Sequence, residues 1–374
     1  MDGDRSMSGS SRRRFLGTAA GATGVALGAA VWGSQQAAAA VFPPAGAQAL
    51  PANQRAFVSG RFALDLGSGE NKQPAGFLQD MEGGGATSDV VLEKVGADHV
   101  QKKHIAGVKY EDITVNVGTG MSKAFYSWIS ATWSANPQRK DGSIVAADFN
   151  LNAMQKREFF NALITEIGIP ACDASSKDAA FMTLKFAPEF TRTQKASGKV
   201  SGGDFGTKQK MWLPSNFRLE IPSLDTTTVT KIEALTIKQK VVENPTGELR
   251  DFQPAPSSVE FPNLVITLAD SSSASWRQWF DSFVIKGNND DAQEKNGRLL
   301  FLTPNLQDAF LEIQLFHLGI FRLHDTTWDD DVAGTGNVGR VKAELYCERM
   351  LFNWLGGVPI PPPPSPNPTP PPTA

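Results

Sequence analysis

A strand followed by a capped helix decides the fold, in the stretch YEDITVNVGTGMSKAFYSWISATW, residues 110–133. From Ile113 to Val117 apolar and polar residues alternate, which is typical of a half-buried β-strand. Further on, apolar residues recur every three or four positions, which is the spacing of one face of an α-helix. Ser122 stands where its side chain can cap the first turn of that helix. The stretch therefore predicts a strand, a short loop and an amphipathic helix.

The same order recurs in FPNLVITLADSSSASWRQWFDSF, residues 261–283, where Ser273 takes the place of Ser122. Other landmarks also occur twice and in one order: alternating strands at 62–66 and 217–221, turn elements at Asp141-Gly142 and Asn296-Gly297, long runs ending at Gly168-Ile169 and Gly319-Ile320, and closing strands at 180–186 and 341–347. Asp-Gly and Asn-Gly predict tight hairpin turns, because both central residues accept a positive φ. The repetition predicts a tandem duplication of a mainly β module with one helix per module.

Helical spacing also predicts which aromatic side chains build the core. We expect Phe125, Trp128, Trp276 and Trp279 to be structural core residues, and a sugar-stacking platform is the alternative for the tryptophans. The expected boundaries are a leader at 1–40, a spacer at 41–54, a first β domain at 55–194, a Gly/Ser/Lys-rich linker at 195–215, a second β domain at 216–354 and a Pro-rich tail at 355–374.

The leader resembles a twin-arginine export signal. Arg12 and Arg13 form the arginine pair, Phe15 and Leu16 follow it, and a Gly/Ala-rich segment then leads to an alanine cleavage site at 37–40. That segment is too short and too rich in glycine to span a membrane. The resemblance implies export of an already folded chain to the periplasm or the exterior. The proline tail favours an extended conformation, which could serve as a stalk, contact the cell wall or have no partner.

Composition excludes some classes of partner. Apolar residues make up 41% of the chain, so folded cores are expected. The net charge of -3 argues against a nucleic-acid partner, which would need a basic surface. There are two cysteines, Cys172 and Cys347. In an oxidising compartment they could form a disulfide, but Cys347 also fits a buried strand position as a free thiol.

No motif predicts a catalytic, cofactor or metal site. Gly334, Gly336 and Gly339 match a dinucleotide fingerprint, but the residues after them alternate as a strand and not as the helix that this motif requires. The acidic residues 325–331 lack the loop glycine and distal glutamate of a helix-loop-helix calcium site. The histidines (His99, His104, His317 and His324) have no metal-ligand spacing. No G-x-S-x-G nucleophile elbow occurs.

The order of landmarks resembles the bacteriophage tail-tube family. In the first module the matching elements are 62–66, Gly76-Phe77, Met81-Glu82, the basic stretch 102–104 and Ala124 to Trp128; the second module matches more loosely. The resemblance implies a β-barrel or sandwich with one flanking helix, and six-fold rings that stack into a tube without a cofactor. A tandem chain suggests that three chains supply six modules. The export signal departs from the family pattern, so the choice between a virion and a cellular role stays open.

Taken together, these features predict an exported, non-catalytic structural protein that associates with itself into a ring, tube or coat. An exported enzyme with a site between the two modules is one alternative. A β-sandwich module that binds the cell wall or glycans is another. The sequence leaves open the ring size, the stacking of rings and any cargo.

Overall fold

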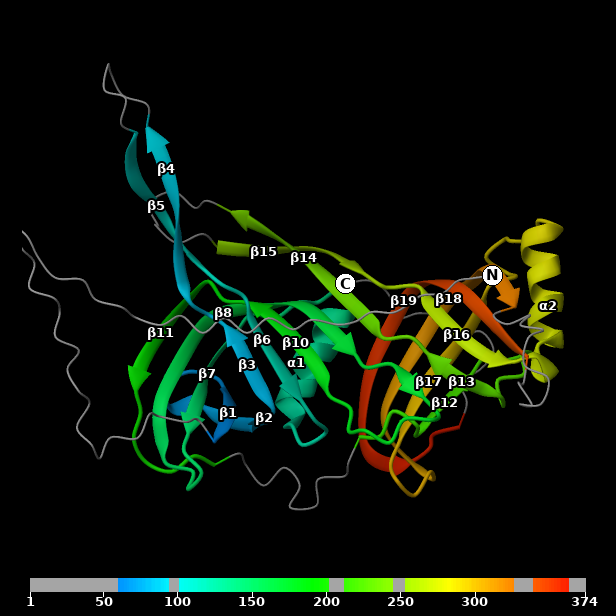
Figure 1. Cartoon of the computed structure of the whole chain (residues 1–374), viewed down its shortest axis with the longest axis horizontal. Coiled ribbons are helices and arrows are strands. Elements are labelled where there is room, and N and C mark those ends of the chain that lie inside the picture. The colour runs from blue at the N-terminus through cyan, green and yellow to red at the C-terminus, as the bar shows by residue number, and fades with distance from the viewer. Residues whose placement is uncertain (1–59, 94–100, 202–211, 245–252, 326–338, 363–374) are drawn as a thin grey trace, which may run out of the picture. The chain divides into compact units, whose positions relative to one another are not determined.

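The computed structural model describes residues 60–93, 101–201, 212–244, 253–325 and 339–362 (Figure 1). These residues are mainly β, with one α-helix in each half of the chain, as the sequence predicts. They all belong to one compact unit, Ala56–Ala374. The predicted leader, spacer, most of the acidic run, Gly334 and Gly336, and the end of the proline tail lie outside the described residues.

The first half contains β1 (Arg61–Leu66), the short helix η1 (Gly69–Asn71), β2 (Gln73–Leu78), β3 (Asp80–Gly83), β4 (Ala86–Glu93), β5 (Lys102–Tyr110), β6 (Ile113–Val117), α1 (Lys123–Trp133), β7 (Lys140–Ala147), β8 (Ala153–Ile169), β9 (Cys172–Asp173), β10 (Met182–Ala187) and β11 (Phe190–Lys195). The second half contains β12 (Phe217–Glu220), β13 (Val229–Ile232), β14 (Leu235–Asn244), β15 (Gln253–Glu260), β16 (Leu264–Ala269), η2 (Asp270–Ser272), α2 (Ala274–Phe280), the π-helical turn η3 (Asp281–Ile285), β17 (Lys295–Leu302), β18 (Asp308–Asp325) and β19 (Arg340–Pro359).

The two large sheets share one order of neighbouring strands. In the first, the order β1-β7-β8-β10-β6-β3 continues from β2 at one edge. In the second, β12-β17-β18-β19-β16-β13 runs in the same sequence and ends on β9. The strands β4 and β5 form a separate two-stranded sheet. β19 runs as one strand where the first half has two, β10 and β11, and it reaches Pro359, so residues 355–359 of the predicted tail belong to the sheet.

Two bulges fix how the halves correspond. Asn161 in β8 (φ 49°) and His317 in β18 (φ 54°) both have a positive φ. The Asn161 N–H donates to Asp141 Oδ1 at 2.8 Å, and the His317 N–H donates to Asn296 Oδ1 at 3.0 Å. Asn161 therefore matches His317. The predicted match between Gly168-Ile169 and Gly319-Ile320 is wrong, because β18 continues to Asp325 beyond its Gly-Ile pair.

The predicted hairpin turns at Asp141-Gly142 and Asn296-Gly297 are also wrong. Both pairs lie inside strands, β7 and β17, and their Asp and Asn side chains support the bulges instead. Glycine is needed there for space. A Cβ on Gly142 would lie 2.5 Å from the Asp65 carbonyl oxygen, and one on Gly297 would lie 2.8 Å from the Glu220 carbonyl oxygen.

The helices bury the aromatic side chains that the sequence singles out. Phe125, Trp128 and Trp276 are fully buried and Trp279 is nearly so. Ser122 Oγ accepts a hydrogen bond from the Phe125 N–H at 3.3 Å and caps α1. The expected cap at Ser273 does not form, because its hydroxyl bonds to Asp270 Oδ1 at 2.8 Å. No helix in the described ranges is long and apolar enough to cross a membrane.

The two cysteines are both buried and free in this structure. Cys172 lies in β9 and Cys347 lies in β19, at the strand position that the alternation predicts. Burial raises the pKa of the Cys172 thiol, and it raises that of Cys347 to about 12. Neither thiol is poised to react.

Candidate assembly interface

The second half of the chain adds strands to the first sheet. β14 lies beside the end of β8, with Leu235 opposite Ile169 and Lys238 opposite Glu166. β15 then pairs with β14 as the outer strand of a hairpin. We call β14–β15 the second hairpin and β4–β5 the first hairpin. Edge strands carry unpaired backbone donors and acceptors, and here a segment from the other half satisfies those of β8.

The first half returns a shorter strand to the second sheet. β9 pairs with β13, with Cys172 opposite Ile232 and Asp173 opposite Lys231. Each half therefore extends the other half's sheet by strand addition. This reciprocal exchange joins the two halves within the one compact unit.

Aromatic side chains of α1, in the first half, also pack against the second half. Tyr126 of α1 stacks on Trp354 of β19 with 3.5 Å between ring centroids and 9° between planes. Trp133 of α1 packs edge-on against Phe352, with centroids 5.5 Å apart, and against Phe261. Tyr126 and Trp133 are only 2% and 1% exposed, and burial raises the pKa of Tyr126. Each such ring contributes about 1.5–3 kcal/mol from burial, so the contact between the halves is strong.

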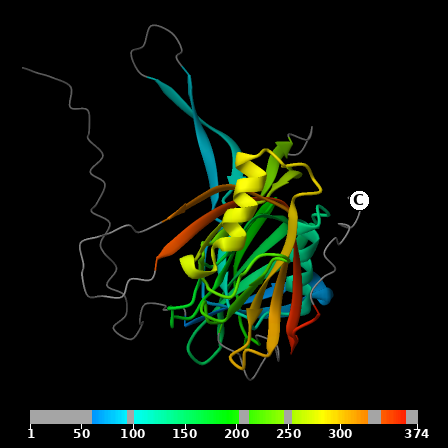
Figure 2. The ribbon, with the colours of Figure 1, turned by 90° about the vertical axis from the view of Figure 1, so that its right-hand side faces the viewer.

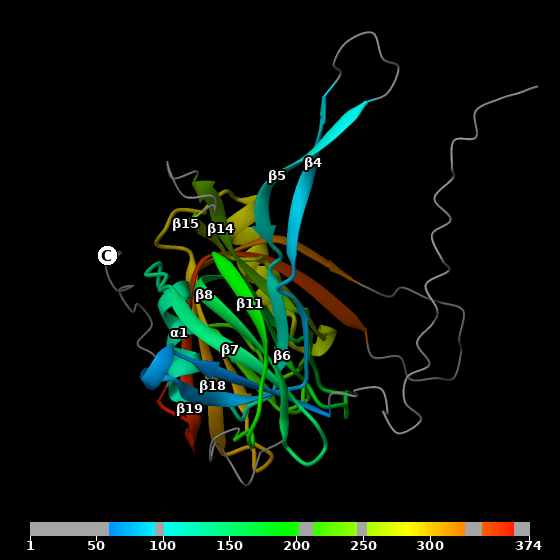
Figure 3. The same ribbon diagram turned by 90° about the vertical axis from the view of Figure 1, so that its left-hand side faces the viewer.

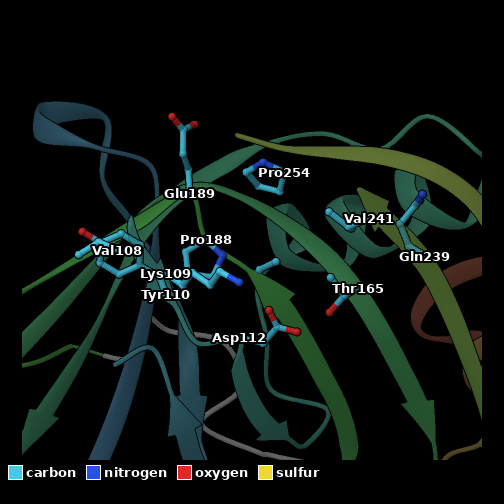
Figure 4. A pocket seen from close by; sticks show the side chains of 11 residues that line it. Val108, Lys109, Tyr110, Asp112, Thr165, Pro188, Glu189, Gln239, Val241 and Pro254 are labelled. Atoms are coloured by element: carbon cyan, nitrogen blue, oxygen red, sulfur yellow. The ribbon is translucent and has the colours of Figure 1, made fainter. Parts of the chain in front are cut away.

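A pocket of about 280 Å³ lies where the two hairpins meet the first sheet (Figure 4). If the chain were an enzyme with a site between its two modules, this pocket, which residues of both halves line, would be the candidate site. Its carboxylates have structural partners: Asp112 lies 3.3 Å from Lys185 Nζ, and Glu189 accepts from Asn161 Nδ2 at 2.9 Å. None of its lining residues is a histidine, cysteine or serine. The pocket offers hydrogen-bonding groups but no histidine-activated nucleophile.

A second cluster combines Glu294, His317 and Glu348, whose ligand atoms lie within 4.8 Å of one another. Glu294 Oε2 lies 2.7 Å from His317 Nδ1, and its Oε1 accepts from the Tyr346 hydroxyl at 2.6 Å. Burial, reinforced by Glu294, raises the pKa of Tyr346. Sequence reasoning missed this cluster because strand register alone brings Glu294 to His317. Since both oxygens of Glu294 are already hydrogen-bonded, we interpret the cluster as structural.

Within the described residues, the second sheet has an unpaired edge that corresponds to the one filled by β14. Thr165 is skipped in the pairing of β8 with β10, and Phe321 is skipped in the pairing of β18 with β19. The segment 166–169 of β8 therefore matches Arg322–Asp325 of β18, which we call the β18 tip. β17 reaches only to Lys295, opposite Leu318. Within the described residues no strand pairs with that side of the β18 tip.

The first hairpin has no sheet to extend within the described part of the chain. β4 and β5 pair only with each other and extend beyond the first sheet (Figures 1 and 3). Their large apolar side chains face solvent; Ile105 is 74% and Val90 is 59% exposed, and Val91 and Leu92 are also exposed. On the second sheet, α2 lies against β18 (Figure 2), and η3 exposes Val284 and Ile285.

Comparison with known proteins finds a similarity in the first half of the chain. Residues 58–191 match the family model described as T4-like virus tail tube protein gp19. A chain of the anti-feeding prophage cap (the AFP tube terminating cap) is 21% identical with a TM-score of 0.34, over 41% of this chain and 99% of that one. A chain of the extended sheath–tube complex of an extracellular contractile injection system is 20% identical with a TM-score of 0.32, over 39% of this chain and 95% of that one. No curated protein matches the chain.

The family match confirms the predicted resemblance to tail-tube proteins for residues 58–191. For the second half, that resemblance stays a prediction. The export signal at Arg12, Arg13, Phe15 and Leu16 lies outside the described residues and also stays a prediction.

Proposed function

Because residues 58–191 match the T4-like tail tube family, we propose that the chain is a non-catalytic structural subunit that associates with further copies of itself into a ring, tube or coat. The observation that carries this proposal is the reciprocal strand exchange between the halves. Within one chain, each half thus already pairs a strand with the edge of the other half's sheet.

We further propose that the halves arose by tandem duplication. The shared strand order, the paired bulges at Asn161 and His317, and the matching glycines Gly142 and Gly297 support this. Each chain then supplies two units. If contacts between chains follow the contact within the chain, three chains supply six units to a closed ring.

Export through the leader and contact with the cell wall through the tail are proposals that rest on the sequence. The start of the tail is held in place: Arg298, which is buried, donates through Nη1 to the Pro362 carbonyl at 3.1 Å. Replacing Arg12 and Arg13 by lysine should keep the protein in the cytoplasm, as immunoblots of cell fractions would report. Unchanged export of that variant contradicts the proposed route.

The test of self-association is the mass of the purified mature protein. Native mass spectrometry across a range of concentrations should detect closed oligomers, with the trimer as the expected species, and negative-stain images should show rings. A strict monomer at high concentration contradicts the proposed function.

A further inference from the structure

We propose that the first hairpin of one copy adds to the β18 tip of the next copy and thereby extends that copy's second sheet. This inference rests on the proposed self-association and names the contact that would produce it. The occupant of the edge is a second copy of this chain, and the argument comes from the contact that the chain already makes internally.

The acceptor edge has the same construction in both halves. β10 pairs with Glu166 and Ile167 on one side of β8, and β14 pairs with the same residues on the other side. In the second sheet, β19 pairs with Arg322 and Leu323 on one side of β18, and within the described residues the other side has no strand. The β18 tip therefore offers the type of edge that β14 occupies in the first sheet.

The side chains around the β18 tip leave its backbone edge available. Arg322 pairs with Glu344 of β19 at 3.2 Å, and the carboxylate of Asp325 pairs with Arg277 of α2. These ion pairs go to elements on the far side of β18 or to the helix. An approaching strand would need to break neither of them in order to pair with the backbone.

The first hairpin, which is the proposed donor, corresponds to the second hairpin, and the second hairpin already pairs with a sheet within the chain. The first hairpin lies between β3 and β6, and the second lies between β13 and β16. Both leave the sheet at the same place, since Met81 pairs with Val115 as Ile232 pairs with Ile266. The root of β14 is buried against the first half, whereas β4 and β5 expose their apolar side chains within the described residues.

Equivalence of the two contacts predicts which residues meet. Counting from the pair Met81 and Ile232, Ala86 corresponds to Ile237 and Thr87 corresponds to Lys238. Within the chain Ile237 lies opposite Ile167, and Lys238 lies opposite Glu166. Between copies, Ala86 should therefore lie opposite Leu323, and Thr87 should lie opposite Arg322.

Disulfide cross-linking tests this register. The protein with Ala86→Cys and Leu323→Cys, and separately the one with Thr87→Cys and Arg322→Cys, should form covalent dimers and trimers under mild oxidation, because paired strands bring Cα atoms within disulfide range. Ala86→Cys with Phe149→Cys is the matched control, since Phe149 is exposed on another loop of the first half. The native cysteines are buried, and the unmodified protein should give no ladder.

Oligomers by native mass spectrometry without a ladder from either pair would overturn the strand addition and leave self-association standing. Monomers without a ladder would overturn both. Peptide mapping identifies what the cysteine at position 323 or 322 contacts. A cross-link to any segment other than residues 86–87 of another copy assigns the edge to a different occupant and contradicts the proposal.

Discussion

α1 and α2 follow matching strands of the two sheets, yet α1 is buried against the other half of the chain and the end of α2 faces solvent. Trp133 at the end of α1 is 1% exposed and contacts Phe261 and Phe352. At the corresponding end of α2, Ile285 in η3 is 68% exposed. The hairpins differ in the opposite sense, because among the described residues the second hairpin is incorporated into a sheet and the first is not. In the part of the chain that the structure describes, one contact between the halves is formed, and the corresponding surfaces of a second such contact are exposed.

The largest expected effect comes from breaking the satisfied contact. Trp133→Ala should lower the free energy of unfolding by about 3–5 kcal/mol, because it removes a fully buried indole from the core shared by the halves. Ile285→Ala is the matched change on the exposed helix end and should cost about 0.5 kcal/mol or less. Urea denaturation measures both. Similar losses in the two variants would show that the two helix ends do not differ as described.

The glycines beside the two bulges, Gly142 and Gly297, differ in how tightly they are packed. Gly142→Ala should destabilise the protein by about 1–3 kcal/mol, because the added Cβ meets the Asp65 carbonyl and the ring of Phe159. Gly297→Ala should cost less, since its nearest contacts are 2.8 Å away, at the Glu220 carbonyl oxygen and the Ile221 side chain. Thermal unfolding of the two variants should rank them in that order. The reverse ranking contradicts the packing given for these positions.

The stacked tyrosine gives the contact between the halves a dependence on pH. Burial raises the pKa of Tyr126 in the folded state. Its contribution is therefore fully present below about pH 10, the ordinary tyrosine pKa, and is lost as the pH rises above that value, since only the unfolded chain then ionises readily. Denaturation at about pH 8 and about pH 11 should show a smaller alkaline loss for Tyr126→Phe than for the unmodified protein. An equal loss would contradict the burial of this hydroxyl.

The smallest effect is a gain in association between copies. By position in the two halves, Arg277 corresponds to Tyr126 and Lys195 corresponds to Trp354, so a contact between copies lacks the aromatic stack. The double variant Arg277→Tyr, Lys195→Trp should associate up to about tenfold more tightly. The lost ion pairs of Arg277 are on the surface and contribute little. Analytical ultracentrifugation measures the association constant, with Arg277→Tyr alone as the control. An association constant that the double variant leaves unchanged would argue against equivalent contacts.

Much of this fold could be predicted from the sequence, because alternation and helical spacing are local signals. They located β6, β16, both helices and the four core aromatics, and the cap at Ser122 followed from its position. The turn at Asp141-Gly142 was predicted wrongly because glycine there serves packing against Asp65, which lies far away in the sequence. The register of β18 was missed because a histidine at positive φ carries no recognisable pattern.

The strand exchange could not be predicted either. Both hairpins show strand-like sequences, and nothing local indicates that one joins a neighbouring sheet while the other does not. The same limit applies to Glu294 and His317, which strand pairing alone brings together. Contacts between distant segments depend on register, and register is set by bulges and packing more than by propensity.

Hydrogen exchange of backbone amides, compared between dilute and concentrated protein, would show whether copies of the chain meet as its two halves do. The amides of β14 and of β8 residues 166–169 should be protected at every concentration. Within Arg322–Asp325 and Ala86–Val90, the amides that point away from β19 and β5 should become protected together, and only at concentrations where oligomers form. Unchanged exchange of both segments in a sample that native mass spectrometry shows to be assembled would contradict the claim that copies meet as the two halves do.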